Sequence, residues 1–202
     1  MHLTGRRPAL LVVDSQAEFV SDDGAVGGAV VGAAAALRQV VRVIDAARAA
    51  DVPVVYTQEL HRPERVDFGR ELDGDEAVHC IEGTPGADFR DETRPGAGEF
   101  VIRKRRYSSF FATDLDLLLR GLGVDTVIVC GFVTDVCVHY TCVDAHQLDY
   151  HVHVVSDAVA GTSDAAHTAA LAAVEYLQSG SVVDADAACA ALGVPATAGA
   201  SS

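Results

Sequence analysis

Short apolar runs alternate with longer segments of helical periodicity along most of this chain. Several of the runs are rich in valine, isoleucine and leucine, which is typical of strands buried on both faces of a parallel sheet. The strands that this pattern predicts are residues 8–13, 53–57, 99–103, 126–130 and 151–158.

The segments between the runs predict helices. Residues 29–50 place apolar side chains at helical spacing, with arginine and aspartate on the outer face. Further helices are expected over residues 113–120, about 135–148 and 163–178. Thr113 suits the N-cap of its helix and Gly121 suits its end.

Strands that alternate with helices indicate an α/β protein. We expect a three-layer α/β/α sandwich around a mostly parallel, Rossmann-like sheet. No internal repeat or linker divides the sequence, so residues 1–202 are expected to form a single domain with a frayed tail from about residue 195. Residues 58–98 are polar and rich in glycine, proline and aspartate, and so long a loop in a compact domain is usually functional.

Charge and cysteine content narrow the classes of function. The net charge of −14 argues against nucleic acid or an anionic membrane as the main partner. No segment reaches the roughly 18 apolar residues of a membrane span, and the N-terminal apolar run is too short for a signal peptide. The cysteines form an odd set without repeated spacing, which is typical of reduced thiols in a cytoplasmic protein. They are Cys80, Cys130, Cys137, Cys142 and Cys189.

Lys104 is the only lysine among the 15 basic residues, and the others are arginine. A chain so biased toward arginine would place arginine wherever any positive charge suffices. A lone lysine therefore favours a site that needs a compact ammonium, although chance explains the count equally well.

Three reactive side chains follow predicted strands. Asp14 comes after the first strand, Lys104 after the third, and Cys137 after the fourth strand and its turn. Sites in open parallel sheets form beyond the carboxyl ends of the strands. Taken singly, these residues are more often a turn cap, a solvated lysine and a small buried hydrophobe. Their joint placement favours a catalytic site.

Cys137 is the cysteine expected to be reactive. It falls in the first turn of a predicted helix, where free N–H groups and the helix dipole lower the pKa of a thiol and can stabilise an oxyanion. Cys142 lies deeper in that helix and Cys130 within a strand, so both are expected to be structural. Asp14 is the candidate base, because burial would raise its pKa, with Lys104 as the neighbouring ammonium.

Three ordered motifs carry a family resemblance. The segments ALLVVDSQAEF, VIRKRRYSSF and GFVTDVCV resemble the catalytic-aspartate, lysine and nucleophile motifs of the isochorismatase-like cysteine hydrolases. The resemblance spans residues 8 to about 178 and implies a parallel α/β sandwich, in agreement with the pattern of strands and helices.

The resemblance implies a covalent mechanism. Asp14 would take the proton of Cys137, whose thiolate attacks an amide-type carbonyl, while Lys104 stabilises the charges and water later hydrolyses the thioester. The backbone N–H groups of Val136 and Cys137 would hold the oxyanion. The family also implies a cis peptide bond in the turn, which here maps to Phe132–Val133.

A metal site is implied by the nicotinamidase branch of that family. Glu59, His61 and His79 fall on its ligand positions, and one carboxylate with two histidines suits a divalent ion such as zinc. Glu59 replaces the usual aspartate and Leu60 the usual tryptophan, which puts nicotinamide itself in doubt as the substrate. Alternatively, both histidines are ordinary loop residues.

Aromatic and basic residues near the motifs have two interpretations each. Phe19, Tyr107 and Phe110 could line a small apolar pocket or pack in the core. Arg103, Arg105 and Arg106 flank Lys104, where they could contact an anionic substrate or form structural ion pairs.

The leading hypothesis is a cysteine hydrolase that cleaves a C–N bond of a small amide, lactam or ureido compound. Its type would be that of nicotinamidase, N-carbamoylsarcosine amidase or streptothricin hydrolase. The alternatives are a hydrolase for the vinyl ether of isochorismate, which would not need Cys137, and a catalytically silent binding domain. We expect a small-molecule substrate, no organic cofactor, and a homo-oligomer by analogy with the family.

Overall fold

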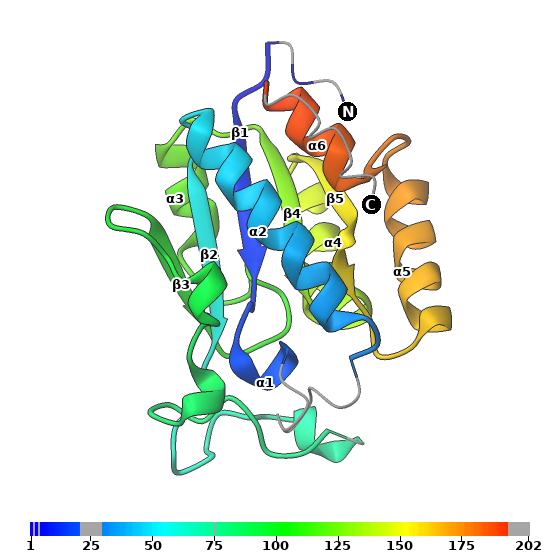
Figure 1. Cartoon of the computed structure of the whole chain (residues 1–202). Coiled ribbons are helices and arrows are strands. Elements are labelled where there is room, and N and C mark those ends of the chain that lie inside the picture. The colour runs from blue at the N-terminus through cyan, green and yellow to red at the C-terminus, as the bar shows by residue number, and fades with distance from the viewer. Residues whose placement is uncertain (2, 4, 21–29, 75, 194–202) are drawn as a thin grey trace, which may run out of the picture.

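The computed structural model describes residues 1, 3, 5–20, 30–74 and 76–193. Within that part, six parallel strands form one sheet in the order β3-β2-β1-β4-β5-β6 (Figure 1). The strands are β1 (Pro8–Val13), β2 (Val54–Glu59), β3 (Phe100–Lys104), β4 (Thr126–Phe132), β5 (His151–Ala160) and β6 (Val182–Val183).

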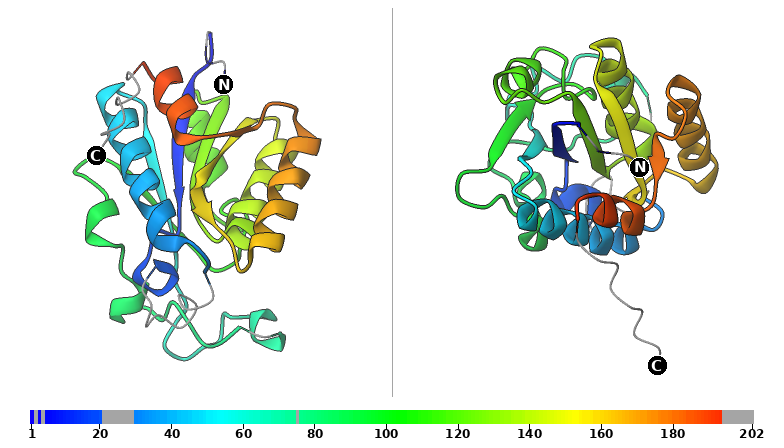
Figure 2. Two further views of the ribbon diagram at one scale, coloured as in Figure 1. Left: turned by 45° about the vertical axis from the view of Figure 1, so that its right-hand side comes forward. Right: turned by 90° about the horizontal axis from the view of Figure 1, so that it is seen from above.

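Helices cover both faces of this sheet. They are α1 (Ala17–Val20), α2 (Ala33–Ala49), α3 (Leu115–Gly121), α4 (His139–Gln147), α5 (Asp164–Leu177) and α6 (Ala185–Ala191). The helices α2 and α6 lie on one face, and α3, α4 and α5 on the other, which gives the three predicted layers (Figure 2). No helix among the described residues is long and apolar enough to cross a membrane.

Each central strand feeds two separate cores, because successive side chains point to opposite faces of the sheet. In β1, Leu10 and Val12 pack toward α2, whereas Leu11 and Val13 pack toward α3 and α4. All four are completely buried, which explains why this strand is continuously apolar instead of alternating. The predicted α/β sandwich with a parallel sheet is therefore confirmed.

Several element boundaries differ from the prediction. Strand β2 runs on to Glu59 and β3 includes Lys104, because main-chain pairing between them continues through polar residues. The single helix expected over 135–148 begins instead as a π-helical turn, η5 (Thr134–Val138), before α4. The strand β6 and the helix α6 are missing from the prediction, since two residues and a short alanine-rich segment carry little periodicity.

Two expectations fall partly or wholly outside the described residues. The helix expected over 29–50 begins at Ala33, and residue 29 is not described. The tail expected to fray from about residue 195 also lies outside the described part. Between β2 and β3, the chain forms three short 3₁₀ turns: η2 (Glu71–Asp73), η3 (Pro85–Ala87) and η4 (Asp91–Thr93).

The strand order has a topological switch point between β1 and β4. From β1 the chain moves outward to β2 and β3, then returns to build β4, β5 and β6 on the other side. The direction of strand addition thus reverses between β1 and β4, and open α/β sheets bind ligands beyond the carboxyl ends of the strands at such a point. Asp14 follows β1 at this point, and Cys137 follows β4.

Gly131 permits β4 to approach β1 closely at the carboxyl ends of the two strands. Its φ is +113°, and a Cβ atom added there would lie 1.9 Å from the carbonyl oxygen of Val13. No side chain fits such a gap, so glycine is required for the two strands to pair up to their carboxyl ends.

We predict that Gly131→Ala lowers the free energy of unfolding by about 3 kcal/mol or more, because the new methyl group collides with backbone. Urea denaturation measures the change. Gly74→Ala is the matched control, since an added Cβ there meets no atom within 4 Å. Equal, small effects of the two substitutions would contradict the close approach of β4 to β1.

Candidate active site

Asp14, Lys104 and Cys137 meet at the carboxyl edge of the sheet. The Lys104 Nζ atom lies 2.7 Å from Asp14 Oδ2 and 3.4 Å from Cys137 Sγ. A carboxylate oxygen of Asp14 lies within 4.8 Å of the Cys137 sulfur. All three residues are at most 2% exposed, so strands distant in the sequence bring an acid, an ammonium and a thiol into one buried contact.

Asp14 is held in an uncommon backbone conformation, with a φ of +46°. Its N–H donates to the carbonyl oxygen and the hydroxyl oxygen of Thr57 at 3.3 and 3.2 Å. The Thr57 hydroxyl in turn donates to Asp14 Oδ1 at 2.8 Å. Neighbouring β2 therefore fixes the direction of the carboxylate, and such an enforced conformation is typical of functional sites.

Burial is the main cause of the pKa shifts of Asp14 and Cys137. Burial raises the pKa of Asp14 above its ordinary value, although the Lys104 ammonium opposes the shift. Burial also raises the pKa of the Cys137 thiol well above its ordinary value, again against Lys104. The expected lowering of the thiol pKa by the helix start is thus outweighed. A protonated thiol needs a base, and a carboxylate with a raised pKa beside it is suited to that task.

The turn that carries Cys137 is tied to the loop between β5 and α5. The Asp135 carboxylate accepts hydrogen bonds from the Thr162 N–H and hydroxyl groups at 2.9 and 2.6 Å. The Thr134 hydroxyl and His167 Nδ1 lie 3.0 Å apart. These bonds connect the π-helical turn that carries Cys137 to the loop after β5 and to helix α5.

The peptide bond between Phe132 and Val133 is cis. After it, the N–H of Val136 donates to the carbonyl of Val133 at 3.1 Å. Of the two oxyanion donors expected from the sequence, Val136 is therefore already engaged with backbone. Cys137 is the better placed donor, because it lies in the first turn, where N–H groups lack acceptors within a helix.

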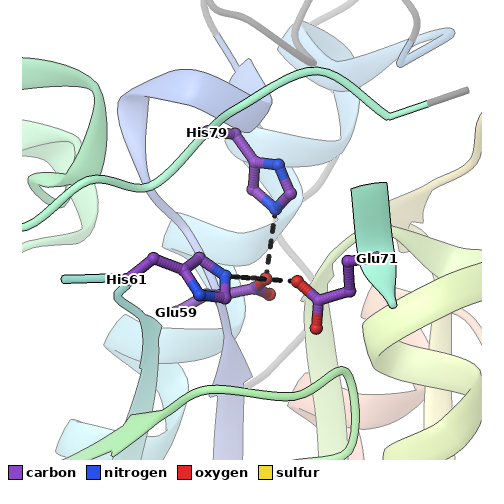
Figure 3. A group of neighbouring side chains, drawn as sticks. All are labelled: Glu59, His61, Glu71 and His79. Atoms are coloured by element: carbon purple, nitrogen blue, oxygen red, sulfur yellow. Dashed lines mark hydrogen bonds and ion pairs between the residues drawn. The ribbon is translucent and has the colours of Figure 1, made fainter. Parts of the chain in front are cut away.

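Glu59 joins this trio through its Oε2 atom, which lies 2.7 Å from Lys104 Nζ and 3.3 Å from Cys137 Sγ. Its other oxygen, Oε1, lies 3.2 Å from the Nε2 atoms of both His61 and His79 (Figure 3). Burial raises the pKa of Glu59, but Lys104 and the histidines outweigh this effect and hold it well below its ordinary value. One carboxylate thus connects the predicted catalytic residues to the predicted metal ligands.

Glu71 joins the three predicted metal ligands as a fourth residue. The sequence analysis did not identify it. Its side chain points at His61, with Oε2 3.2 Å from Nε2 (Figure 3). Glu71 lies in the long loop among many acidic residues, and no spacing rule distinguishes it from them. Ligand atoms from Glu59, His61, Glu71 and His79 all lie within 4.8 Å of one another.

These four residues fit a divalent cation. Two imidazole nitrogens and two carboxylate oxygens are a donor set that zinc accepts. Glu71 is buried, its Oε1 atom has no hydrogen-bond partner among the described residues, and its Oε2 atom faces His61. Burial lowers the pKa of His79, but its bond to Glu59 prevails and raises it to about 9. Glu59 thus favours a proton on His79, and a bound cation would interact with the carboxylates in place of that proton.

Gln16 is a further site residue that the sequence did not reveal. Its side-chain amide accepts from the N–H of Glu59 at 2.9 Å and donates to the carbonyl of Glu59 at 2.8 Å. The same amide donates to the Ala87 carbonyl at 2.8 Å. Gln16 thereby fixes the backbone of Glu59 and attaches the long loop to the end of β2.

Aromatic rings surround the two histidines. Phe68 stacks on His61 with a centroid distance of 3.8 Å, and Phe19 meets His79 edge-on at 6.3 Å. Phe19 is buried, and its ring packs against His79. Tyr107, the other residue expected in a pocket, stacks on Tyr140. Phe110 lies elsewhere, stacked on Tyr150.

The comparisons with known proteins extend over most of the chain. Residues 8–187 match the family model of the isochorismatase domain. The maleamate amidohydrolase of Pseudomonas putida is 33% identical over 169 residues, which cover 83% of this chain and 78% of that protein.

Solved structures give the same relationship. The N-carbamoylsarcosine amidase of Thermoplasma acidophilum has a TM-score of 0.76 and 34% identity, covering 89% of this chain and 97% of that chain. The pyrazinamidase of Pyrococcus horikoshii in complex with zinc has a TM-score of 0.74 and 29% identity, covering 88% and 98%. The resemblance of the three motifs is thus confirmed, and this chain belongs to the isochorismatase family.

Proposed function

We propose that this protein hydrolyses a C–N bond of a small amide, lactam or ureido compound through a thioester on Cys137. The buried contact of Cys137, Lys104 and Asp14 carries the proposal. The similar proteins named as maleamate amidohydrolase and N-carbamoylsarcosine amidase support it, since both names denote cleavage of an amide-type C–N bond.

The first half of the reaction forms the thioester. Asp14 takes the thiol proton, and the sulfur of Cys137 attacks the carbonyl carbon while the carbonyl electrons move to oxygen. The N–H of Cys137 stabilises this oxyanion, and Lys104 stabilises the negative charge of the thiolate as it forms. The oxyanion then collapses, the C–N bond breaks, and Asp14 returns its proton to the leaving nitrogen.

The second half releases the acid. Asp14, now ionised, takes a proton from water, and the resulting hydroxide attacks the thioester carbon. The C–S bond breaks and the proton on Asp14 returns to the sulfur, so the enzyme is restored. A vinyl-ether hydrolase would leave the thiol without a role, and the contacts of Cys137 with Lys104 and Glu59 favour the thioester route.

We also propose that Glu59, His61, Glu71 and His79 hold one divalent cation such as zinc. The similar pyrazinamidase solved in complex with zinc supports this proposal, as does the convergence of the four ligand atoms. A bound cation would supply a Lewis acid that orients the substrate beside the thiol. The five free thiols of the chain support a reducing, cytoplasmic setting, and the homo-oligomer stays a prediction.

We predict that Cys137→Ala lowers amide hydrolysis by about a thousandfold or more, because no other group can form the acyl intermediate. Ammonia release from a panel of small amides measures activity, and intact-mass spectrometry detects the acyl adduct. Cys142→Ala is the control, since Cys142 is equally buried in the adjacent helix. Turnover that survives in Cys137→Ala would exclude the thioester.

Lys104→Met is expected to abolish activity and to lower the free energy of unfolding by about 3–5 kcal/mol, since it leaves buried carboxylates without a counter-charge. Urea denaturation measures the second effect. Arg103→Met removes a neighbouring charge whose side chain is 66% exposed, and should change stability by about 0.5 kcal/mol or less. Similar changes in the free energy of unfolding for both variants would contradict the role given to Lys104.

Glu71→Gln is expected to weaken zinc binding about tenfold to a hundredfold, because one carboxylate ligand is lost. Isothermal titration of zinc into metal-stripped protein gives the dissociation constant without relying on activity. Asp73→Asn removes an exposed carboxylate from the same 3₁₀ turn and should leave zinc binding as in the wild type. An unchanged dissociation constant in Glu71→Gln would remove Glu71 from the metal site.

A further inference from the structure

The two histidines of the proposed metal site are connected through the backbone of Cys80. The carbonyl oxygen of Cys80 accepts a hydrogen bond from the N–H of His61 at 2.7 Å, and Cys80 directly follows His79 in the chain. His61 and Ile81 form an isolated parallel bridge at the same place. The separation of the two imidazole groups therefore depends on where the backbone of Cys80 lies.

Cys80 has a backbone conformation that is uncommon for any residue other than glycine. Its φ is +49°, and the residue is completely buried. Such a conformation persists only where the surrounding structure enforces it. The hydrogen bonds made by the backbone of Cys80 thus also determine where the preceding residue, His79, begins.

Glu18 provides the hydrogen bond on the other side of Cys80. Its Oε2 atom accepts the N–H of Cys80 at 2.5 Å, which joins helix α1 to the long loop. A carboxylate forms a stronger bond with a backbone N–H than a neutral acceptor does. Cys80 is therefore held by Glu18 at its N–H and by His61 at its carbonyl.

Gly86 gives the side chain of Glu18 the room to reach Cys80. A Cβ atom added at Gly86 would lie 2.7 Å from both Cγ and Cδ of Glu18, so that side chain would have to move. Close by, the N–H of Ala17 donates to the carbonyl of Asp88 at 2.9 Å, which joins α1 to the end of η3. The path of Glu18 toward Cys80 is thus set by backbone on two sides.

The ring of His79 is oriented by contacts of its own. Its Nδ1 atom lies 2.7 Å from the carbonyl oxygen of Ala77, and Phe19 packs edge-on against the ring. A bond from Nδ1–H to Ala77 leaves Nε2, which faces Glu59, for a metal ion. Helix α1 therefore supports His79 twice, through Phe19 at the ring and through Glu18 at the next N–H.

We propose that Glu18 is a positioning residue of the metal site, which keeps His79 in place beside His61 by binding the N–H of Cys80. The proposal rests on the proposed metal site and extends it. Glu18 is not one of the four residues whose ligand atoms converge, so it acts on the metal through another residue.

Isothermal titration of zinc into metal-stripped protein measures this role. Glu18→Ala is expected to weaken zinc binding about tenfold to a hundredfold, because His79 loses its fixed position. Glu18→Gln keeps an oxygen that can accept the N–H of Cys80, and should bind zinc within about threefold of the wild type. Wild-type affinity in Glu18→Ala, or an equal loss in Glu18→Gln, would overturn the proposal.

Glu82→Ala is the matched control for the zinc titrations. It removes a carboxylate from the same loop, two residues after Cys80, that faces Arg103 at 3.7 Å and is 45% exposed. Its zinc dissociation constant should equal that of the wild type. A loss as large as that of Glu18→Ala would mean that any carboxylate of the loop has this effect, and would overturn the specific role of Glu18.

A His79→Ala background shows whether Glu18 acts through His79. If it does, adding Glu18→Ala changes the zinc dissociation constant by no more than about twofold. A general disturbance of the fold would instead multiply the two effects, and that result would overturn the proposal. Gly86→Ala should weaken zinc binding in the wild type and have no further effect in Glu18→Ala, because both substitutions remove the same contact.

Hydrogen exchange of the Cys80 amide tests the contact without metal. By nuclear magnetic resonance, this amide should exchange at least about tenfold faster in Glu18→Ala than in the wild type or Glu18→Gln. Equal rates would overturn the proposal. A wild type that binds no zinc would overturn the metal site and this inference together, whereas the acyl adduct on Cys137 is measured separately. Zinc binding that is normal in both the wild type and Glu18→Ala would overturn this inference alone.

Discussion

The site depends on one buried ammonium. Removing the charge of Lys104 from water is costly, and burial alone would favour its neutral form. The negative charges of the neighbouring carboxylates, that of Asp14 above all, outweigh this effect, so the pKa of Lys104 is raised well above its ordinary value. The ammonium in turn lowers the pKa of both carboxyl groups relative to what burial alone would give. Each partner is therefore stable in the interior only in the presence of the others.

The parallel sheet makes this mutual dependence possible. The strand order places the ends of β1, β2, β3 and β4 side by side, so each contributes one charged or reactive group near a single point. Loops alone could not hold these groups so rigidly, whereas strand pairing and the close approach at Gly131 set their spacing. The chemistry at the edge is thus a consequence of how the core packs.

The sequence predicted those parts of the site that follow strands. Asp14, Lys104 and Cys137 each stand directly after an apolar run or its turn, and the topology then brings them together. Gln16 and Glu71 were missed because contacts between segments distant in the sequence give them their place in the site, and such contacts leave no periodic signal. Short or irregular elements such as β6, α6 and the π-helical turn were missed because so few residues carry little periodicity.

Glu59 shows how one side chain can serve both halves of the site. Gln16 fixes its backbone at the end of β2, so the position of the carboxylate depends on the reach of the side chain. Glutamate has one methylene group more than aspartate, which places its carboxylate farther from the strand. In this chain, Oε2 reaches Lys104 while Oε1 faces the histidines. A cation bound at Oε1 would draw electron density from the whole carboxylate and weaken its hold on Lys104. A bound metal ion would thus influence the thiol through the single carboxylate of Glu59. The ammonium of Lys104 would pass that influence on to Cys137.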